Sequence, residues 1–170
     1  MPEKFYSMTP DKFYSIPDFV DDSTAVEIAK LLPKVRRHGK ARNQVIRYGS
    51  IKPYPSGFLK KEIPDVFKKL NIPFEYDSVT LNEYMPGQML DWHIDKPESG
   101  NRIVILSLLS DCDILFRNKK ESLNILNFEM LKNSLSIFSD SLRWDYEHKV
   151  IANEYRISIV FRNSKETIKR

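Results

Sequence analysis

Cysteine is nearly absent from this 170-residue chain, which contains Cys112 and no other. A lone cysteine excludes an internal disulfide and a zinc site made of several cysteines, and it fits a reducing compartment. Long apolar stretches are also missing, because no run approaches the roughly 20 residues that a membrane-spanning helix needs. The first residues, MPEKFYSMTPDKF, lack the apolar core of a signal peptide. We therefore expect an intracellular protein, cytoplasmic or nuclear, with no membrane partner.

The chain has no strong excess of one charge. Lysine and arginine number 27 and aspartate and glutamate 23, which gives a net charge of +4 and an isoelectric point of about 9.0. This mild excess is compatible with a polyanionic partner but does not require one. Hydrophobic residues make up 41% and charged residues 29% of the chain, as in globular proteins and not in disordered ones. The length fits one domain with its own core, and we expect a monomer.

Helical patterns are confined to the first 70 or so residues. Residues 21–33 predict a helix that Asp22 or Ser23 caps, followed by a basic stretch, 34–57, that reads as a hairpin or a mobile flap. Residues 58–73 predict a second helix, with its proline tolerated near the start of a turn.

The chain becomes β-rich from residue 77 onwards. Short runs of β-branched and aromatic residues alternate with turn residues, which is typical of a sandwich or a jelly-roll barrel. The runs are SVTLNEY, NRIVILSLLS, DILFRN, LNILNF, NSLSIFS, YEHKV and YRISIVFR. We therefore predict a mainly β fold with flanking helices, in which the helices support one side of a β-sandwich.

The segment DWHID contains a candidate metal site. On an extended backbone, His93 and Asp95 project to the same side. Only three histidines exist, and His38 lies among charged residues where solvation explains it, so His148 is the candidate third ligand. Two histidines and one carboxylate suit Fe(II) that activates oxygen. Zinc hydrolases use a similar set, and a His-x-Asp pair is common by chance, so the triad alone does not fix the metal.

Two candidate strands carry polar side chains on one face. In YRISIVFR, Arg156, Ser158 and Arg162 alternate with three apolar residues. Guanidinium groups bind carboxylates in a bidentate manner, so this face could bind a small acid. An edge strand with its polar face in water gives the same pattern, and this stretch taken alone favours that second interpretation. In SVTLNEY, Asn82 and Tyr84 share a face. That face suits either hydrogen bonds to a keto acid or exposure to solvent.

Together these pieces resemble the AlkB-like family of Fe(II)- and 2-oxoglutarate-dependent dioxygenases. The shared pattern is N-x-Y-x-P-G, then H-x-D, a distal histidine and the closing R-x-S-x-x-x-R, from about Val79 to Arg162. The resemblance implies a double-stranded β-helix, that is, a jelly roll. It also implies that O2 is consumed at an iron held by three ligands, which are His93, Asp95 and His148.

The resemblance also assigns the 2-oxoglutarate site. Asn82 and Tyr84 match the residues that bind this cosubstrate. Arg156 matches the arginine that pairs with its distal carboxylate, and Arg162 matches the one near the metal end. Ser158 stands where many members carry an asparagine, so its contact with the cosubstrate is a weaker inference.

For the substrate, the resemblance implies oxidative demethylation of N-alkylated nucleobases in DNA or RNA, as repair or RNA modification, with release of formaldehyde, succinate and CO2. Residues 41–50 resemble the family's nucleotide-recognition lid. The alternatives are a tRNA-base or protein side-chain hydroxylase, or a non-catalytic jelly roll that binds nucleic acid. The predicted contacts to a single-stranded nucleic acid are Arg42, Arg47, Tyr48, Tyr54 and Trp92.

The resemblance divides the single domain, 1–170, into three parts. Residues 1–76 are predicted to hold the N-terminal helices and the lid, 77–163 the catalytic jelly roll, and 164–170 a tail.

Overall fold

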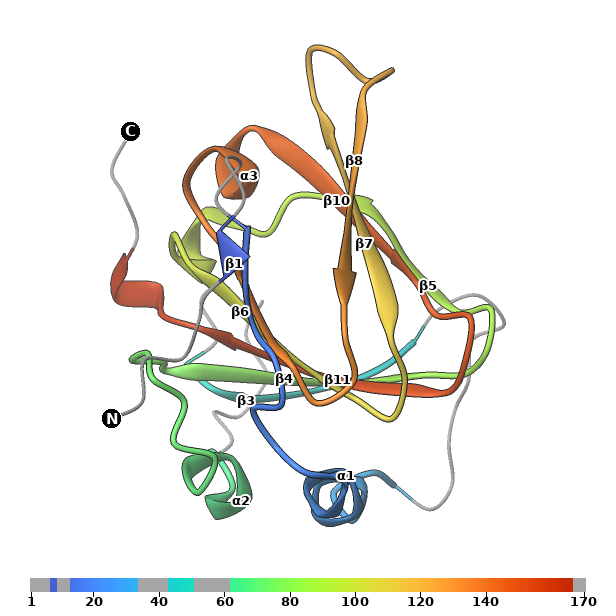
Figure 1. Ribbon diagram of the computed structural model, residues 1–170. Helices are drawn as coiled ribbons and strands as arrows, with labels where there is room; N and C mark the ends of the chain where they lie inside the picture. The colour runs from blue at the N-terminus through green and yellow to red at the C-terminus, as the bar shows by residue number, and fades with distance from the viewer. Residues whose placement is uncertain (1–6, 9–12, 34–42, 51–61, 167–170) are drawn as a thin grey trace.

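Two antiparallel β-sheets lie face to face in the computed structural model, which describes residues 7–8, 13–33, 43–50 and 62–166 (Figure 1). The larger sheet has seven strands in the order β1-β2-β9-β6-β11-β4-β3, and the smaller has four in the order β5-β10-β7-β8. This arrangement confirms the predicted jelly roll.

The large sheet is formed by strands from both halves of the chain, and each pairs antiparallel with its neighbours. Its strands are β1 Ser7–Met8, β2 Phe13–Ile16, β3 Gln44–Gly49, β4 Ser78–Tyr84, β6 Ile103–Leu108, β9 Leu135–Phe138 and β11 Arg156–Arg162. The small sheet consists of β5 Met89–His93, β7 Cys112–Asn118, β8 Ile125–Met130 and β10 Tyr146–Ile151.

Short helices flank the sheets. They are α1 Asp22–Ala29, α2 Asp65–Lys68 and α3 Asp140–Trp144, with single 3-10 turns at Pro97–Ser99 and Ser164–Glu166. In Figure 1, α1 and α2 cover the face of the large sheet that points away from the small sheet. None of the helices in the described ranges is long and apolar enough to cross a membrane.

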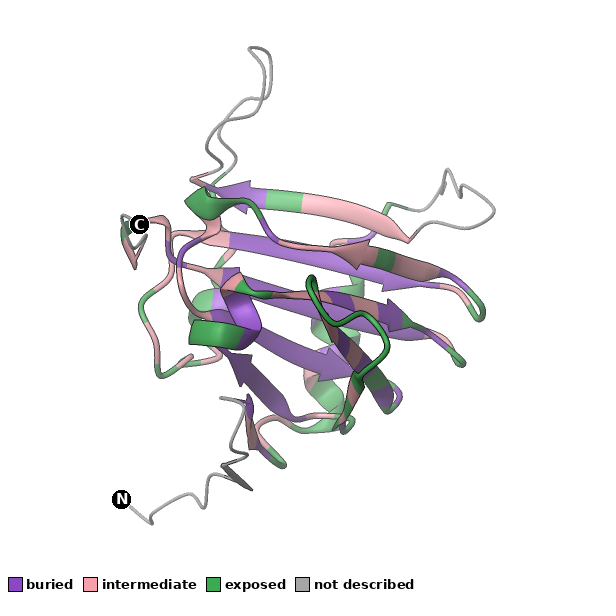
Figure 2. Cartoon of the chain, turned by 90° about the horizontal axis from the view of Figure 1, so that it is seen from above, coloured by how far each residue is buried: buried purple, intermediate pink, exposed green. Residues whose placement is uncertain are grey.

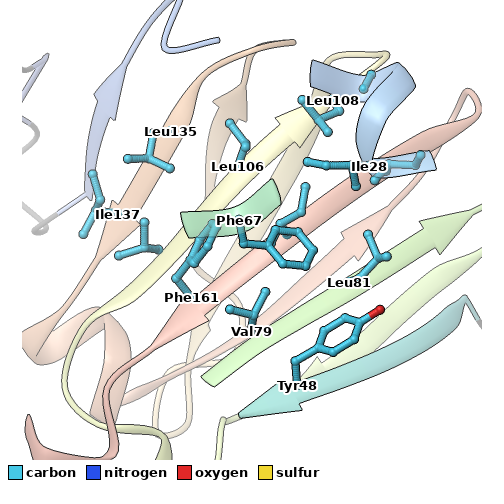
Figure 3. Close-up of a cluster of buried hydrophobic side chains, with 14 of the residues drawn as sticks. Ile28, Tyr48, Phe67, Val79, Leu81, Leu106, Leu108, Leu135, Ile137 and Phe161 are labelled. Carbon is cyan, nitrogen blue, oxygen red and sulfur yellow. The ribbon is translucent and has the colours of Figure 1, made fainter. Parts of the chain in front are cut away.

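The period-two alternation of β11 builds two different layers. Ile157, Ile159 and Phe161 join the apolar cluster between the large sheet and the two helices, which Figure 3 shows around Phe67 and Ile28. Their neighbours on the strand face the space between the sheets instead. Each such core residue contributes about 1.5–3 kcal/mol through burial, so this alternation fixes which side of β11 faces the interior.

The space between the two sheets is filled only in part by apolar side chains. Ile105 and Phe138 of the large sheet meet Ile114 and Phe116 of the small sheet in a second cluster. Figure 2 shows the resulting burial along the central strands of both sheets. Polar residues take over at one end of this interior, and the candidate site lies there.

One interpretation of the sequence was wrong. β11 is not an edge strand with a wet polar face, because it pairs with β4 on one side and β6 on the other. Its polar residue Arg156 is 1% exposed. β11 is therefore a central strand, and its polar face lies toward the small sheet and not in water.

The two helices predicted in the N-terminal part of the chain are present, but their starts differ from the prediction. Asp21, and not Asp22 or Ser23, caps α1, because its carboxylate accepts a hydrogen bond from the Ser23 amide at 3.0 Å. The second helix is the short α2, which starts after Pro64; proline disfavours helical geometry in the residue before it. Residues 58–61 of that prediction lie outside the described part of the chain.

Helical structure also occurs outside the first 70 residues, contrary to expectation, since α3 lies directly before β10. A helix of five residues is too short to show a period of 3.6. The predicted hairpin or flap, 34–57, contributes β3 to the large sheet, and 34–42 and 51–57 lie outside the described residues. The predicted boundary at residue 76 therefore runs through one sheet, because β2 and β3 precede it.

Gly49 offers a test of the packing between β3 and the strand beside it. Gly49 and Gly87 both have positive φ, at 82° and 86°. A Cβ at Gly49 would lie 2.2 Å from the Asp77 carbonyl oxygen, whereas one at Gly87 would meet nothing within 4 Å. We expect Gly87→Ala to lose about 1–2 kcal/mol from backbone strain and Gly49→Ala about 1–3 kcal/mol more from overpacking. Urea unfolding measures both losses, and equal losses would contradict the tight contact.

Candidate active site

The strand register brings two of the three histidines together. In the pairing of β5 with β10, His93 lies directly opposite His148, and their ring centroids are 4.2 Å apart. The register shifts by one residue between this pair and the next, Leu90 opposite Val150. Because of this bulge, both Leu90 and His93 face the interior although they are three positions apart.

Asp95 completes the cluster from just beyond the end of β5. Its Oδ1 lies 3.4 Å from His93 Nε2 and 3.6 Å from His148 Nε2. One ligand atom from each of the three residues can be chosen so that all lie within 4.8 Å of one another. The other carboxylate oxygen, Oδ2, accepts a hydrogen bond from Arg162 Nε at 2.7 Å. Arg162 is itself held by Thr80, whose hydroxyl accepts from Nη1 at 3.0 Å.

The electrostatics favour the metal-binding forms of Asp95 and His148. Burial opposes ionisation of Asp95, but the Arg162 guanidinium and the two imidazoles outweigh it and hold the pKa of this carboxyl well below its usual value. Burial lowers the pKa of His148 to about 3, so this ring is neutral at physiological pH. For His93, burial alone would lower the pKa, yet the hydrogen bond and charge of Asp95 leave it raised.

A buried cation stands on the same interior face. Arg156 is 1% exposed, and its Nε and one terminal nitrogen have no hydrogen-bond partner among the described residues. Burying a guanidinium without partners is costly. The pairing of β11 with β4 places Arg156 beside Tyr84 and Ser158 beside Asn82, all four of them buried. Such a group fits the carboxylate of a small acid, and the donors around it suit the same ligand.

The phenol of Tyr84 is a neutral donor in this surrounding. Burial raises its pKa to about 12, against a smaller lowering by the Arg156 charge. The carboxamide of Asn82 accepts a hydrogen bond from Asn43 Nδ2 at 2.9 Å, which fixes its orientation.

A cavity of about 300 Å³ joins the histidine cluster to these groups. Its inner wall is apolar and includes Ile105, Ile114 and Met130. Its outer rim is polar and carries charges of both signs, from Arg47, Asp77, Lys96 and Glu98. The cavity thus combines the cation, the donors and the His-Asp-His cluster in one space that is wet at one end.

Of the five predicted substrate contacts, the structure describes three, and one of these three lines the cavity. Arg47 does line the cavity. Tyr48 does not, because on β3 it faces the opposite side of the sheet, 8% exposed, where its ring packs 5.7 Å from that of Phe67. Trp92 does not line the cavity either and instead lies against the Arg117 guanidinium at 4.3 Å, because it is next to the inward-facing His93 on the strand and so faces outward. Arg42 and Tyr54 lie outside the described residues.

Sequence reasoning missed two residues that support the cluster. Asn43, which orients Asn82, lies directly before β3, in a stretch that the sequence shows only as basic. Arg143 lies in α3 and is 1% exposed. One signal was available for it: an arginine five residues before a candidate histidine ligand sits in the otherwise apolar context SLRW.

Comparison with known families now gives the class of the protein. Residues 27–162 match the profile of the 2OG-Fe(II) oxygenase superfamily. The chain belongs to this superfamily, whose members are dioxygenases that use Fe(II), 2-oxoglutarate and O2. The His-Asp-His cluster is a donor set that fits Fe(II), and the buried Arg156, with two nitrogens that lack partners among the described residues, fits the dicarboxylate.

The chain is also similar to individual proteins. The uncharacterized protein L905 of Acanthamoeba polyphaga mimivirus is 33% identical over 107 residues, 55% of this chain and 51% of that protein, so the chain spans about half the length of this curated relative. The structure of OsALKBH1 aligns with a TM-score of 0.68 at 18% identity, over 92% of this chain and 100% of that one.

A further solved structure shares the fold. The 2OG-Fe(II) oxygenase family oxidoreductase from Burkholderia pseudomallei aligns with a TM-score of 0.60 at 12% identity, over 90% of this chain and 84% of that one. At identities of 18% and 12%, these two structural similarities establish the fold alone. The predicted AlkB-like resemblance is confirmed at this level, as a jelly roll that carries a 2OG-Fe(II) oxygenase sequence.

The low pKa of His148 predicts a pH dependence for the metal-free protein. His148 takes up a proton near pH 6.5 when unfolded but only near pH 3 when folded, so stability falls as the pH drops through this window. The loss from pH 6.5 to pH 5 is roughly 2 kcal/mol, at about 1.4 kcal/mol per pH unit.

Because His93 has a raised pKa and gives the opposite slope, the reference is His148→Gln, which retains His93. Urea unfolding in the presence of a chelator at pH 7 and pH 5 should show the larger acid loss in the unmodified protein. The same pH dependence in both proteins would contradict a buried, neutral His148.

Proposed function

We propose that the protein is an Fe(II)- and 2-oxoglutarate-dependent dioxygenase in which His93, Asp95 and His148 hold the iron and Arg156 binds the distal carboxylate of 2-oxoglutarate. The observation that carries this proposal is the buried guanidinium of Arg156, whose Nε and one terminal nitrogen have no hydrogen-bond partner among the described residues and which shares one cavity with the three-ligand cluster. A structural ion pair would have a protein carboxylate at Arg156.

Asp95 and His148 are already in the forms that metal binding requires, and His93 has one ring nitrogen directed at the same point. The Nδ1 of His93 lies 2.6 Å from the Asp91 carbonyl oxygen, so this nitrogen carries the proton and Nε2 is left for the metal. Asp95 is ionised and His148 is neutral, for the reasons given by their pKa shifts. Arg162 binds one oxygen of Asp95 and leaves the other directed at the imidazoles.

The remaining polar residues of the cavity are assigned to the cosubstrate. Tyr84 donates its phenolic proton, and Asn82 and Ser158 contribute further hydrogen bonds from the neighbouring strands. Arg162 lies at the metal end, as the resemblance implies. Bound iron and 2-oxoglutarate supply the oxidation of a substrate C–H bond by O2, with succinate and CO2 as products. The apolar inner wall limits the access of water to that reaction.

For the substrate, we propose N-alkylated nucleobases in single-stranded DNA or RNA, which lose formaldehyde after hydroxylation. The fold shared with an AlkB homologue, the net charge of +4 and the position of Arg47 at the rim support this choice. The second candidate is a protein side chain, and the acidic groups of Asp77 and Glu98 at the same rim favour it, since they repel phosphates.

A panel of substrates separates these candidates. The protein with Fe(II), 2-oxoglutarate and O2 is incubated with methylated DNA and RNA oligonucleotides, single- and double-stranded, and with a peptide library, and mass spectrometry reads the products. Loss of a methyl group from an oligonucleotide supports the nucleobase proposal, and a gain of one oxygen on a peptide supports the second candidate.

We expect His93→Ala to abolish succinate release, while the exposed control Lys132→Gln retains it. Undiminished decarboxylation in His93→Ala would remove this residue from the metal site.

Arg156 provides a separate prediction about the cosubstrate. One charge-assisted hydrogen bond contributes about 1.5–3 kcal/mol, so Arg156→Gln should raise the KM for 2-oxoglutarate roughly 10- to 150-fold. The matched control is Arg102→Gln, which removes a guanidinium that pairs with Glu166 at 3.7 Å and does not line the cavity. An unchanged KM in Arg156→Gln would contradict the assigned role.

A further inference from the structure

Asp95 lies in a segment that the sheet does not hold. β5 ends at His93, and residues 94–96 belong to no helix or strand before the 3-10 turn Pro97–Ser99. The main chain around Asp95 therefore has no ladder of hydrogen bonds to fix it. A metal ligand in such a segment needs another support, because small displacements of a ligand weaken metal binding.

Arg143 supplies that support from a distant part of the chain. Its Nε donates to the Gly100 carbonyl at 2.8 Å, one terminal nitrogen to the Asp95 carbonyl at 3.0 Å, and the other to the Lys96 carbonyl at 2.7 Å. The guanidinium thus spans both ends of the segment. It also lies 4.2 Å from the centroid of the Trp144 ring.

The same residue is linked to the second strand of the metal site. Arg143 lies in α3, which leads directly into β10, and β10 carries His148. The Trp144 indole donates to the Asn101 side chain at 2.7 Å, which adds a second contact between α3 and the end of the segment. Asp95 is therefore held twice, through its carboxylate by Arg162 and through its main chain by Arg143.

We propose that Arg143 is a positioning residue for the metal site, which fixes the main chain of Asp95 relative to His148. This inference rests on the proposed role of these two residues as ligands. Arginine is suited to the task because its planar fork presents donors in several fixed directions, so one side chain reaches three separate carbonyls. Lysine keeps the charge but lacks this fork, and methionine keeps only the length.

The test is the affinity for a metal ion, measured without turnover. Mn(II) or Co(II) is titrated into the chelator-treated protein and into Arg143→Lys and Arg143→Met, by calorimetry and, for Co(II), by its visible absorption. We expect a 10- to 100-fold weaker affinity in Arg143→Met, as for other residues that support ligands, and a partial recovery in Arg143→Lys.

A stability-matched control separates positioning from a general loss of structure. Ile28→Ala removes a fully buried side chain on the far face of the large sheet and destabilises the fold through the cavity that it leaves. This variant should bind the metal as tightly as the unmodified protein. If the Arg143 variants are destabilised but bind the metal with unchanged affinity, the positioning role is wrong.

The unmodified protein gives a second readout in case the Arg143 variants do not fold. Hydrogen exchange is compared with and without Mn(II). Protection by the metal should extend from residues 94–100 to α3 and should leave α1 unaffected. Protection of the segment without α3 would overturn the proposed link. Failure of the unmodified protein to bind either metal would instead count against the proposed function itself.

Discussion

A carboxylate buried between two sheets remains ionised only when cations and donors surround it, and Asp95 is that carboxylate. Its pKa lies far below the usual value because Arg162 and two imidazoles compensate for burial. The surrounding residues come from four strands: β4 holds Arg162 through Thr80, β5 and β10 present the histidines, and β11 carries Arg162. The two sheets must therefore close on each other before the site exists.

The same alternation of side chains serves stability and chemistry. On β4 and β11, one face enters the apolar cluster beneath α1 and α2 and the other lines the cavity. A one-residue slip of either strand would bury its polar side chains among aliphatic groups and expose the aliphatic groups in the cavity. The cost of such a slip explains how Arg156, whose Nε and one terminal nitrogen lack a partner in the part of the chain that the structure describes, stays fixed at the interior face.

The sequence was sufficient for the fold class and for the residues of the cluster because both depend on local pattern. Period-two runs predict strands, and His-x-Asp with a distal histidine predicts three candidate ligands, which the structure brings together. The orientation of individual side chains was less predictable. Tyr48 was expected to contact substrate, yet the alternation of side chains along β3 turns it to the opposite face of the sheet, where it packs beside Phe67. Arg143 was missed because its three partners are main-chain carbonyls, which no residue pattern records.

The bulge between β5 and β10 sets a limit on how this strand can change in length. Two residues, Asp91 and Trp92, face the single residue Lys149 there. Loss of either one would restore regular pairing and would still leave Leu90 opposite Val150 and His93 opposite His148, with both side chains facing the interior. Loss of both would make Leu90 and His93 neighbours on the strand, and one of the two would then face solvent. The strand can therefore lose one residue between Leu90 and His93, but not two, and keep both side chains in the cavity.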